Sequence, residues 1–175
     1  MGGVAKVLVT GDKGYVGSVL TDVLLHSGYS VVGFDTGYYQ ECLVESNSTT
    51  YPSIGRDIRD ISMSDFDGID AVVHLAALSN DPLGELAPTL TEQINLQGTI
   101  RLAKCAREAG VRRLVYASSQ SMYGVSKTGH ELDEDDSDKN AITAYARTKW
   151  DAELALKALA DPDFTVVCFR PSTIF

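Results

Sequence analysis

The stretch Thr10-Gly-Asp-Lys-Gly-Tyr-Val-Gly17 joins a short apolar run, Val4–Thr10, to a segment with helical spacing, Val16–Ser27. Its glycines follow the pattern G-x-x-G-x-x-G. Glycine at these places permits a tight turn, lets the backbone approach a pyrophosphate and lets a helix pack close to a sheet. The start of a helix also offers unpaired N–H groups and a partial positive charge to a phosphate. The stretch therefore predicts a strand, a phosphate-binding turn and a helix.

Apolar runs and helical patterns alternate along the rest of the chain. Short runs rich in Val, Leu and Phe, typical of buried parallel strands, lie at Val4–Thr10, Ser30–Asp35, Ala71–Leu75, Arg113–Ala117 and Thr165–Arg170, with a weaker one at Ser53–Asp57. Helical spacing marks Val16–Ser27, Thr89–Ala109 and Ala141–Ala160, with a short helical turn over Arg59–Phe66. This alternation predicts an α/β fold of one domain, residues 1–175, with a doubly wound parallel sheet (a Rossmann fold) and strand order 3-2-1-4-5-6.

Local signals mark the ends and faces of these elements. Gly28 and Gly110 stand where C-terminal helix caps belong. Thr36–Thr50 and Gly124–Asn140 have the composition of irregular loops. One apolar stripe runs along the first helix, made of Val16, Val19, Leu20, Val23 and Leu24.

Composition and charge exclude several classes of function. The 175 residues are 44% hydrophobic and 22% charged, as in a soluble globular protein. A formal net charge of −9 argues against a nucleic-acid interface, which needs a basic face. The acidic run Glu131–Asp138 indicates a solvated loop rather than a metal site, so we expect no metal. The opening strand Val4–Thr10 leaves no room for a signal peptide, and no apolar run approaches the roughly 20 residues of a membrane helix. We therefore expect a cytoplasmic protein without membrane contact.

The three cysteines are Cys42, Cys105 and Cys168. They are odd in number, widely spaced and outside any zinc-like pattern. Cys105 and Cys168 lie in apolar stretches, which predicts that they are core residues.

Asp35 ends the second predicted strand, downstream of the glycine-rich turn. A carboxylate at this position can accept hydrogen bonds from both hydroxyls of an adenosine ribose, and it repels a 2′-phosphate. The sequence therefore favours NAD over NADP as the cofactor. Lys13 inside the turn is a mild counter-signal, because an ammonium there could bind a phosphate.

Tyr145 and Lys149 lie four residues apart in a predicted helix. A helix places residues i and i+4 on one face, so the ammonium of Lys149 can lie beside the phenol of Tyr145. A tyrosine with an ordinary pKa near ~10 is a poor base at neutral pH. A nearby positive charge favours its phenolate and lowers that pKa. Downstream of a dinucleotide-binding turn, this spacing predicts a catalytic base.

Taken together, these residues resemble the extended short-chain dehydrogenase/reductase family of NAD-dependent sugar-nucleotide epimerases and dehydratases. The resemblance covers the whole chain. It rests on ordered motifs: Thr10 to Gly17, Asp57-Ile58-Arg59-Asp60, His74-Leu-Ala-Ala77, Asn95 in Ile94-Asn-Leu-Gln-Gly98, Ser118-Ser-Gln-Ser-Met-Tyr-Gly124, Tyr145 to Lys149, and Arg170-Pro171.

The resemblance implies roles for individual residues. Cofactor contacts are implied for Gly11, Gly14, Tyr15, Val16, Gly17, Asp35, Asp57, Ile58, Leu75, Ala76, Ala77, Tyr145, Lys149 and Pro171, with Ser172 near the nicotinamide. Catalytic roles are implied for Ser119, Tyr145 and Lys149, and substrate contacts for Ser119, Gln120, Ser121 and Tyr145. Asp57 is expected to accept the adenine amino group. Asn95 is expected to brace the active-site strand, and we interpret His74 as a packed core histidine.

The implied chemistry is the transient oxidation of a sugar hydroxyl, in which Tyr145 removes the proton while hydride passes to NAD. An epimerase returns the hydride to the opposite face of the keto intermediate. Gln120 and Ser121 stand where 4,6-dehydratases have an Asp-Glu pair, and Thr173 and Phe175 where the family often has Asn and Tyr. Members of the family also have a C-terminal substrate region, which we expect to be absent from this chain.

The expected partner is a nucleotide-sugar substrate. A homodimer through helices 89–109 and 141–160 is possible, with Leu96, Ile100, Ala103, Ala155 and Leu156 on a shared face or, equally, in the core. Two alternatives stay open beside the enzyme. In the first, the chain is a free-standing NAD(P)-binding module that turns nothing over. In the second, it assembles with another polypeptide that supplies the substrate region.

Overall fold

The computed structural model describes residues 5–39, 50–79, 81–125, 132–135, 137–172 and 174. Cys42, Thr173 and Phe175 lie outside the described residues, as do most of the predicted loop Thr36–Thr50 and part of the acidic run Glu131–Asp138.

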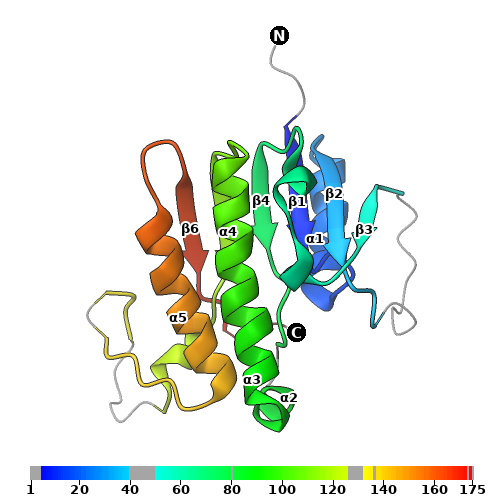
Figure 1. Cartoon of the computed structure of the whole chain (residues 1–175). Coiled ribbons are helices and arrows are strands. Elements are labelled where there is room, and N and C mark those ends of the chain that lie inside the picture. The colour runs from blue at the N-terminus through cyan, green and yellow to red at the C-terminus, as the bar shows by residue number, and fades with distance from the viewer. Residues whose placement is uncertain are drawn as a thin grey trace.

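Six parallel strands form one sheet in the order β3-β2-β1-β4-β5-β6 (Figure 1). Their bounds are β1 Lys6–Thr10, β2 Ser30–Asp35, β3 Ser53–Gly55, β4 Ala71–His74, β5 Arg113–Ala117 and β6 Thr165–Phe169. The predicted doubly wound fold and its strand order are confirmed, and the predicted strands differ from these only at their ends. Parallel pairing places the carboxyl ends of all six strands at one edge, which is where such sheets bind ligands.

Helices cover both faces of the sheet. Helix α1 (Tyr15–His26) lies behind the sheet in Figure 1, and α4 (Thr99–Glu108) and α5 (Ala144–Leu159) lie in front of it. The predicted helix Thr89–Ala109 is a succession of α3 (Pro88–Thr91), the π-helix η4 (Glu92–Gly98) and α4. The predicted helical turn after β3 is two 3₁₀ segments, η2 (Ile58–Asp60) and η3 (Met63–Phe66).

Two short elements were not predicted, α2 (Asp81–Leu86) and the 3₁₀ segment η5 (Gln120–Tyr123). Among the described residues, no helix combines the length and apolar character that a bilayer crossing requires.

The predicted cap glycines follow the helices as expected. Gly28 directly follows Ser27, the C-cap residue of α1, and has φ +85°. Gly110 directly follows Ala109, the C-cap residue of α4, and has φ +84°. Their N–H groups donate to Leu25 and Arg107, carbonyls of the final helical turn. Only glycine adopts this left-handed backbone without strain, so both helices end where the sequence indicates.

The larger core lies between the sheet and helices α4 and α5. It is built from alternate strand residues and the inner helix faces, among them Leu8, Phe34, Val72, Leu102, Leu114, Tyr116 and Leu156. Cys105 and Cys168 are partly buried free thiols that pack against this core, as predicted. A smaller cluster under α1 contains Val7, Val9 and Val31.

The apolar stripe of α1 is only partly buried. Leu20 and Leu24 pack against the smaller cluster, but Val19 is 63% exposed and Val23 is 54% exposed. The fully buried positions of the helix are instead Gly17 and Thr21. These small residues let α1 approach β1 closely, and this orientation turns Val19 and Val23 away from the sheet.

Because α1 lies close to the turn before it, adding a methyl group at Gly17 should change the free energy of unfolding. A Cβ at Gly17 would lie 2.0 Å from the carbonyl oxygen of Gly11, a rigid backbone atom. We expect Gly17→Ala to lower the free energy of unfolding by about 2–3 kcal/mol. Helix propensity alone would raise it by about 1 kcal/mol, so the sign of the change tests the contact.

Chemical denaturation of both proteins gives the measurement. Gly55→Ala is the matched control, because a Cβ there has no atom within 4 Å and its free energy of unfolding should hardly change. Equal effects of the two substitutions would contradict the close backbone contact at Gly17.

Candidate functional site

A cleft of about 1330 Å³ opens along the carboxyl edge of the sheet, from the β1–α1 turn to the segment after β6. It exceeds the range of roughly 300–1,000 Å³ that is usual for small-molecule sites. The structure brings together at this cleft every site residue singled out in the sequence: Gly11, Gly14, Tyr15, Val16, Gly17, Asp35, Asp57, Ile58, Leu75, Ala76, Ala77, Ser119, Gln120, Ser121, Tyr145, Lys149 and Pro171.

The glycine-rich turn forms one end of the cleft. The N–H of Gly11 donates to Phe34 of the neighbouring strand (2.9 Å), and the N–H of Gly14 donates back to the Gly11 carbonyl (3.0 Å). Gly14 is the N-cap of α1, and no side chain caps the helix there. The first turn of α1 therefore presents N–H groups and its positive dipole end to the cleft, which suits an anion.

Asp35, at the end of β2, holds the turn from the side. One carboxylate oxygen accepts the N–H of Gly37 (2.7 Å) and the other accepts the N–H of Lys13 (3.3 Å). Asp57, after β3, is engaged differently, because both of its oxygens accept hydrogen bonds from Arg59. Those bonds outweigh partial burial and lower the pKa of Asp57, so it is an ionised acceptor already paired with a cation.

Small residues after β4 allow the glycine-rich turn between β1 and α1 to approach the end of β4 closely. The Leu75 N–H donates to the Thr10 carbonyl (3.0 Å), and the Ala76 N–H lies 3.3 Å from the Thr10 hydroxyl oxygen. Gly11 has φ +75°, and a Cβ on it would lie 2.8 Å from the Ala76 nitrogen. The ends of β1 and β4 thus approach each other through the backbone of Gly11 and Ala76.

Asn95 in the π-helix fixes the next part of this floor. Its side-chain oxygen accepts the N–H of Leu78 (2.8 Å) and its amide donates to the Leu78 carbonyl (3.1 Å). The sequence predicted that Asn95 braces the active-site strand. The segment that it holds follows β4 and lines the cleft, so the contact is of the predicted kind.

His74 is a packed core residue, which confirms its interpretation from the sequence. It is fully buried, with Nδ1 2.6 Å from the Thr10 hydroxyl and Nε2 2.8 Å from the Thr99 hydroxyl. Burial, with a smaller effect of Lys149, lowers the pKa of His74 to about 3. The ring is therefore neutral at physiological pH and links β1, β4 and α4.

Ser119, Tyr145 and Lys149 meet at the other end of the cleft. Lys149 is 3% exposed, and its ammonium lies 5.8 Å from the centre of the Tyr145 ring. The same ammonium donates a hydrogen bond to the carbonyl of Ala117 at the end of β5 (2.8 Å). Two residues further on, Ser119 lines the same part of the cleft, and its hydroxyl is close enough to lower the pKa of Tyr145. The i, i+4 spacing therefore produces the expected juxtaposition.

The protonation states differ from the expectation drawn from the sequence. Burial raises the pKa of Tyr145, the Ser119 hydroxyl works against that rise, and the charge of Asp81 adds to it. Burial also lowers the pKa of Lys149 to about 7. The prediction that Lys149 brings the pKa of Tyr145 down is therefore wrong for the chain alone, because a buried lysine loses much of the charge that would do so.

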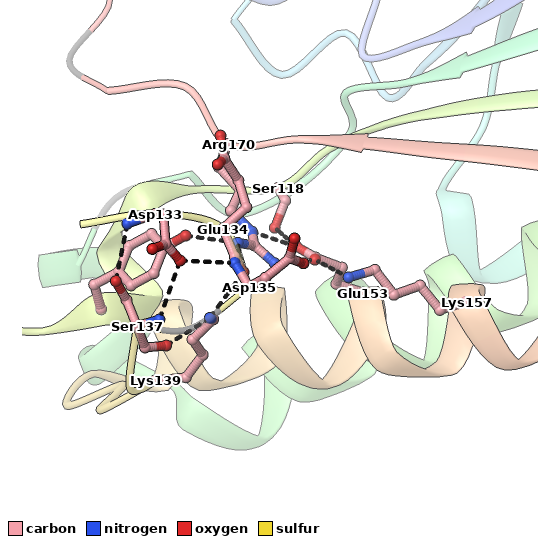
Figure 2. A network of polar contacts seen from close by, with 10 residues as sticks. Ser118, Asp133, Glu134, Asp135, Ser137, Lys139, Glu153, Lys157 and Arg170 are labelled. Carbon is pink, nitrogen blue, oxygen red and sulfur yellow. Dashed lines mark hydrogen bonds and ion pairs between the residues drawn. The ribbon is translucent and has the colours of Figure 1, made fainter.

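A buried ion pair anchors the helix that carries Tyr145 and Lys149. Glu153 is 1% exposed and accepts hydrogen bonds from Arg170 (2.5 and 3.1 Å), from the Ser118 hydroxyl (2.8 Å) and from Lys157 (2.9 Å). Figure 2 shows these side chains converging from α5, from the end of β5 and from the end of β6. Arg170 also donates to the Glu134 carbonyl, which attaches the loop before α5 to the same cluster.

Sequence reasoning missed the part of the cleft formed by α2. Asp81 and Pro82 line the cleft, and Asp81 accepts a hydrogen bond from Thr143, the N-cap of α5 (2.7 Å). Glu85 accepts the N–H of Ala144 (2.5 Å). The signal was the dipeptide Asp81-Pro82, since proline is frequent in a first helical turn. Within the described part of the chain, His, Cys, Asp and Glu form no group of three that could hold a metal.

Comparison with known proteins places this site in a family context. The model of the NAD dependent epimerase/dehydratase family matches residues 7–175. UDP-glucose 4-epimerase of Mycolicibacterium smegmatis is 36% identical over 129 residues, which cover 68% of this chain and 40% of that enzyme. dTDP-D-glucose 4,6-dehydratase of Mus musculus is 32% identical over 181 residues, covering 97% of this chain and 50% of that enzyme.

A solved structure with a similar fold is UDP-glucose-4-epimerase of Stenotrophomonas maltophila with bound NAD and formylated UDP-arabinopyranose. It superimposes with a TM-score of 0.81 at 31% identity and covers 95% of this chain and 52% of that chain. The chain thus spans about half the length of the curated relatives it matches.

The buried ion pair leads to a stability prediction. Breaking a buried pair leaves an uncompensated charge, so we expect Glu153→Gln to lower the free energy of unfolding by about 3 kcal/mol. Asp151→Asn, at an exposed position on the same helix, should stay within about 0.5 kcal/mol. Urea denaturation of the three proteins at neutral pH checks both values.

The pH dependence of that difference has a definite sign. Burial opposes ionisation of Glu153, but hydrogen bonds from Arg170, Lys157 and Ser118 prevail and lower its pKa below the usual 4.5. The stabilisation is therefore present above pH 4.5 and is lost as the pH falls through the lowered value. A difference between wild type and Glu153→Gln that grows in acid would contradict the assigned pair.

Proposed function

Because the chain belongs to the NAD dependent epimerase/dehydratase family, we propose that it is the cofactor-binding part of an enzyme that transiently oxidises a hydroxyl group of a nucleotide sugar. The observation that carries this proposal is the meeting of Ser119, Tyr145 and Lys149 in the same cleft as an uncapped helix N-terminus. A protein that only bound a dinucleotide would have no use for a tyrosine hydroxyl beside a buried lysine.

The residues present fit NAD. The turn from Gly11 to Gly17 offers backbone N–H groups without side chains in the way, which suits the pyrophosphate. Asp35 would accept the hydroxyls of the adenosine ribose, and its charge would repel the 2′-phosphate of NADP. Pro171 and Ser172 would border the nicotinamide end, and Asp57 with Ile58 the adenine end. When bound, NAD would supply the hydride acceptor.

We propose that Tyr145 and Lys149 act as one proton-holding unit. A neutral phenol with a neutral amine contains the same number of protons as a phenolate with an ammonium. Because burial raises the pKa of Tyr145 and lowers that of Lys149 to about 7, the neutral pair is the major form in the chain alone, and the phenolate with an ammonium is the minor, reactive form. The phenolate form would then accept the proton of the sugar hydroxyl, whose oxygen Ser119 holds by a hydrogen bond.

The type of reaction is narrowed by the residues after β5. Gln120 and Ser121 line the cleft beside Ser119. Neither has the carboxyl group that eliminating water from a sugar requires, so epimerisation or simple oxidation fits better than 4,6-dehydration. The second candidate function is an NAD-binding module without turnover. The presence of Ser119, Tyr145 and Lys149 in one cleft disfavours it, because cofactor binding alone does not require the Tyr145 hydroxyl.

We also propose a homodimer and a cytoplasmic location. Ala103 and Leu156 are fully buried in the chain's own core, so they cannot belong to a dimer face. Leu96, Ile100 and Ala155 are half-buried, and Leu154 of α5 is 47% exposed, so these residues remain available for the contact. Free thiols at Cys105 and Cys168 agree with a reducing compartment.

Removing one hydroxyl tests the proposed base. Tyr145→Phe should leave NAD affinity within about twofold and lower the rate of NAD reduction by nucleotide sugars by about 10²–10⁴. Calorimetry measures the affinity, and NADH absorbance measures the reduction. Tyr116→Phe is the matched control, because Tyr116 contacts the same ammonium (4.9 Å) and does not line the cleft. Unchanged reduction in Tyr145→Phe would refute the assigned role.

Removing one charge tests the cofactor preference. The wild-type chain should bind NAD more tightly than NADP. Asp35→Asn should weaken NAD binding about tenfold through the loss of a charged acceptor, and it should narrow the preference. Asp67→Asn, exposed and outside the cleft, should leave both affinities unchanged. A wild-type preference for NADP would overturn the role of Asp35.

A further inference from the structure

Asp12 is the one residue of the glycine-rich turn Gly11–Gly14 whose side chain is fully buried (1% exposed). It does not line the cleft. Its carboxylate lies against β2, where a Cβ on Gly33 would be 2.1 Å from Oδ2 and 2.8 Å from Oδ1. The turn therefore has two sides, one open to the cleft and one filled by a carboxyl group that is pressed onto the sheet.

The two oxygens of this carboxyl group have unequal surroundings. Oδ2 accepts hydrogen bonds from the Tyr51 hydroxyl (3.1 Å) and the Ser53 hydroxyl (3.0 Å). Oδ1 is buried and has no hydrogen-bond partner among the described residues. A buried, unpaired oxygen costs far more free energy when it carries charge than when the group is neutral. The surroundings of Asp12 therefore favour the protonated form of its carboxyl group.

The charged and titratable groups around Asp12 act in opposing directions on its pKa. From β2 it faces Asp35, whose negative charge opposes ionisation, and from the segment before β3 it faces Tyr51. Helix α1 contributes the uncharged Thr21, whose hydroxyl lowers the pKa of Tyr51. Lys13 is the adjacent cation in the turn. Burial, the largest effect, raises the pKa of Asp12 above its usual 3.8, although Ser53 and Tyr51 work against the rise.

We propose that Asp12 is a proton-dependent positioning residue of the cofactor site, so that binding of the dinucleotide is coupled to uptake of a proton at Asp12. This inference rests on the proposed function, because it requires that the pyrophosphate binds on the open side of the turn. Ionised Asp12 and the phosphates would be anions on opposite sides of the same short backbone segment. Neutral Asp12 would not repel the phosphates, so the positive dipole end of α1 would interact with the phosphates without a competing anion.

The direction of the coupling follows from linkage. An anion bound near a carboxyl group favours its protonated form, and by reciprocity a proton on Asp12 increases affinity for the anion. NAD affinity should therefore be highest at low pH and should fall as the pH rises through the pKa of Asp12. The midpoint of the decrease lies above pH 3.8, because burial raises the pKa of Asp12 above that value.

Calorimetric titration of the chain with NAD tests this proposal. Between about pH 4 and pH 6, we expect wild-type affinity to fall about fivefold or more. Titrations in two buffers of different ionisation enthalpy should show net proton uptake. Asp12→Asn keeps the shape of the group without its charge, so its affinity should not change across this range, which lies below the pKa of Lys149 (about 7), and should equal or exceed that of wild type at the upper end. Asp151→Asn, an exposed control, should keep the wild-type profile.

Each further outcome decides the proposal. A wild-type slope in Asp12→Asn, or binding without proton uptake by wild type, overturns the coupling and leaves the NAD site standing. If Asp12→Asn fails to fold, Tyr51→Phe decides. Loss of a hydroxyl that stabilises the carboxylate should move the affinity profile to higher pH, and an unmoved profile overturns the proposal. Absence of NAD binding by wild type at every pH overturns both this inference and the proposed function.

Discussion

Backbone packs on backbone where β1 passes into α1, and the geometry of the whole cleft depends on that contact. A methyl group at Gly17 would meet the Gly11 carbonyl, and one at Gly11 would meet Ala76 at the end of β4. Close packing at these points fixes how far the helix N-terminus stands from the two central strands. Because all strands are parallel, the same edge also receives Ser119 and Lys149, so a single local distance sets the relation between the phosphate end and the proton-transfer end.

Two buried charges one helical turn apart on α5 are treated in opposite ways. Glu153 receives hydrogen bonds from Arg170, Ser118 and Lys157, and it keeps its charge despite burial. Lys149 donates to the Ala117 carbonyl, and burial lowers its pKa to about 7, so its charge is marginal near pH 7. The first arrangement fixes the helix in place, and the second leaves a group that can change protonation. Anchoring and reactivity are thus separated along one helix face.

The sequence predicted the fold from short-range patterns, and it predicted most residues of the cleft through the family resemblance. Glycine spacing, strand periodicity and the Tyr145–Lys149 interval are local features, and the order of parallel strands follows from them through right-handed crossovers. Protonation states could not be predicted, since the pKa of Lys149 depends on burial by segments distant in sequence. The same holds for Asp12, whose partners Tyr51 and Ser53 are 39 and 41 residues away in the sequence. The exposure of Val19 and Val23 was missed because periodicity does not say which neighbour covers a helix flank.

The π-helix between α3 and α4 makes this helix intolerant of changes in length. Asn95 within it holds Leu78 at the cleft, and Thr99 after it bonds the Asn95 carbonyl and the ring of His74. Deleting one residue between them would rotate everything downstream by about 100°, turning Leu102 and Ala106 out of the core or Asn95 away from the floor. Evolutionary insertions and deletions in this segment would therefore be selected against, whereas substitutions that preserve its residue count would survive.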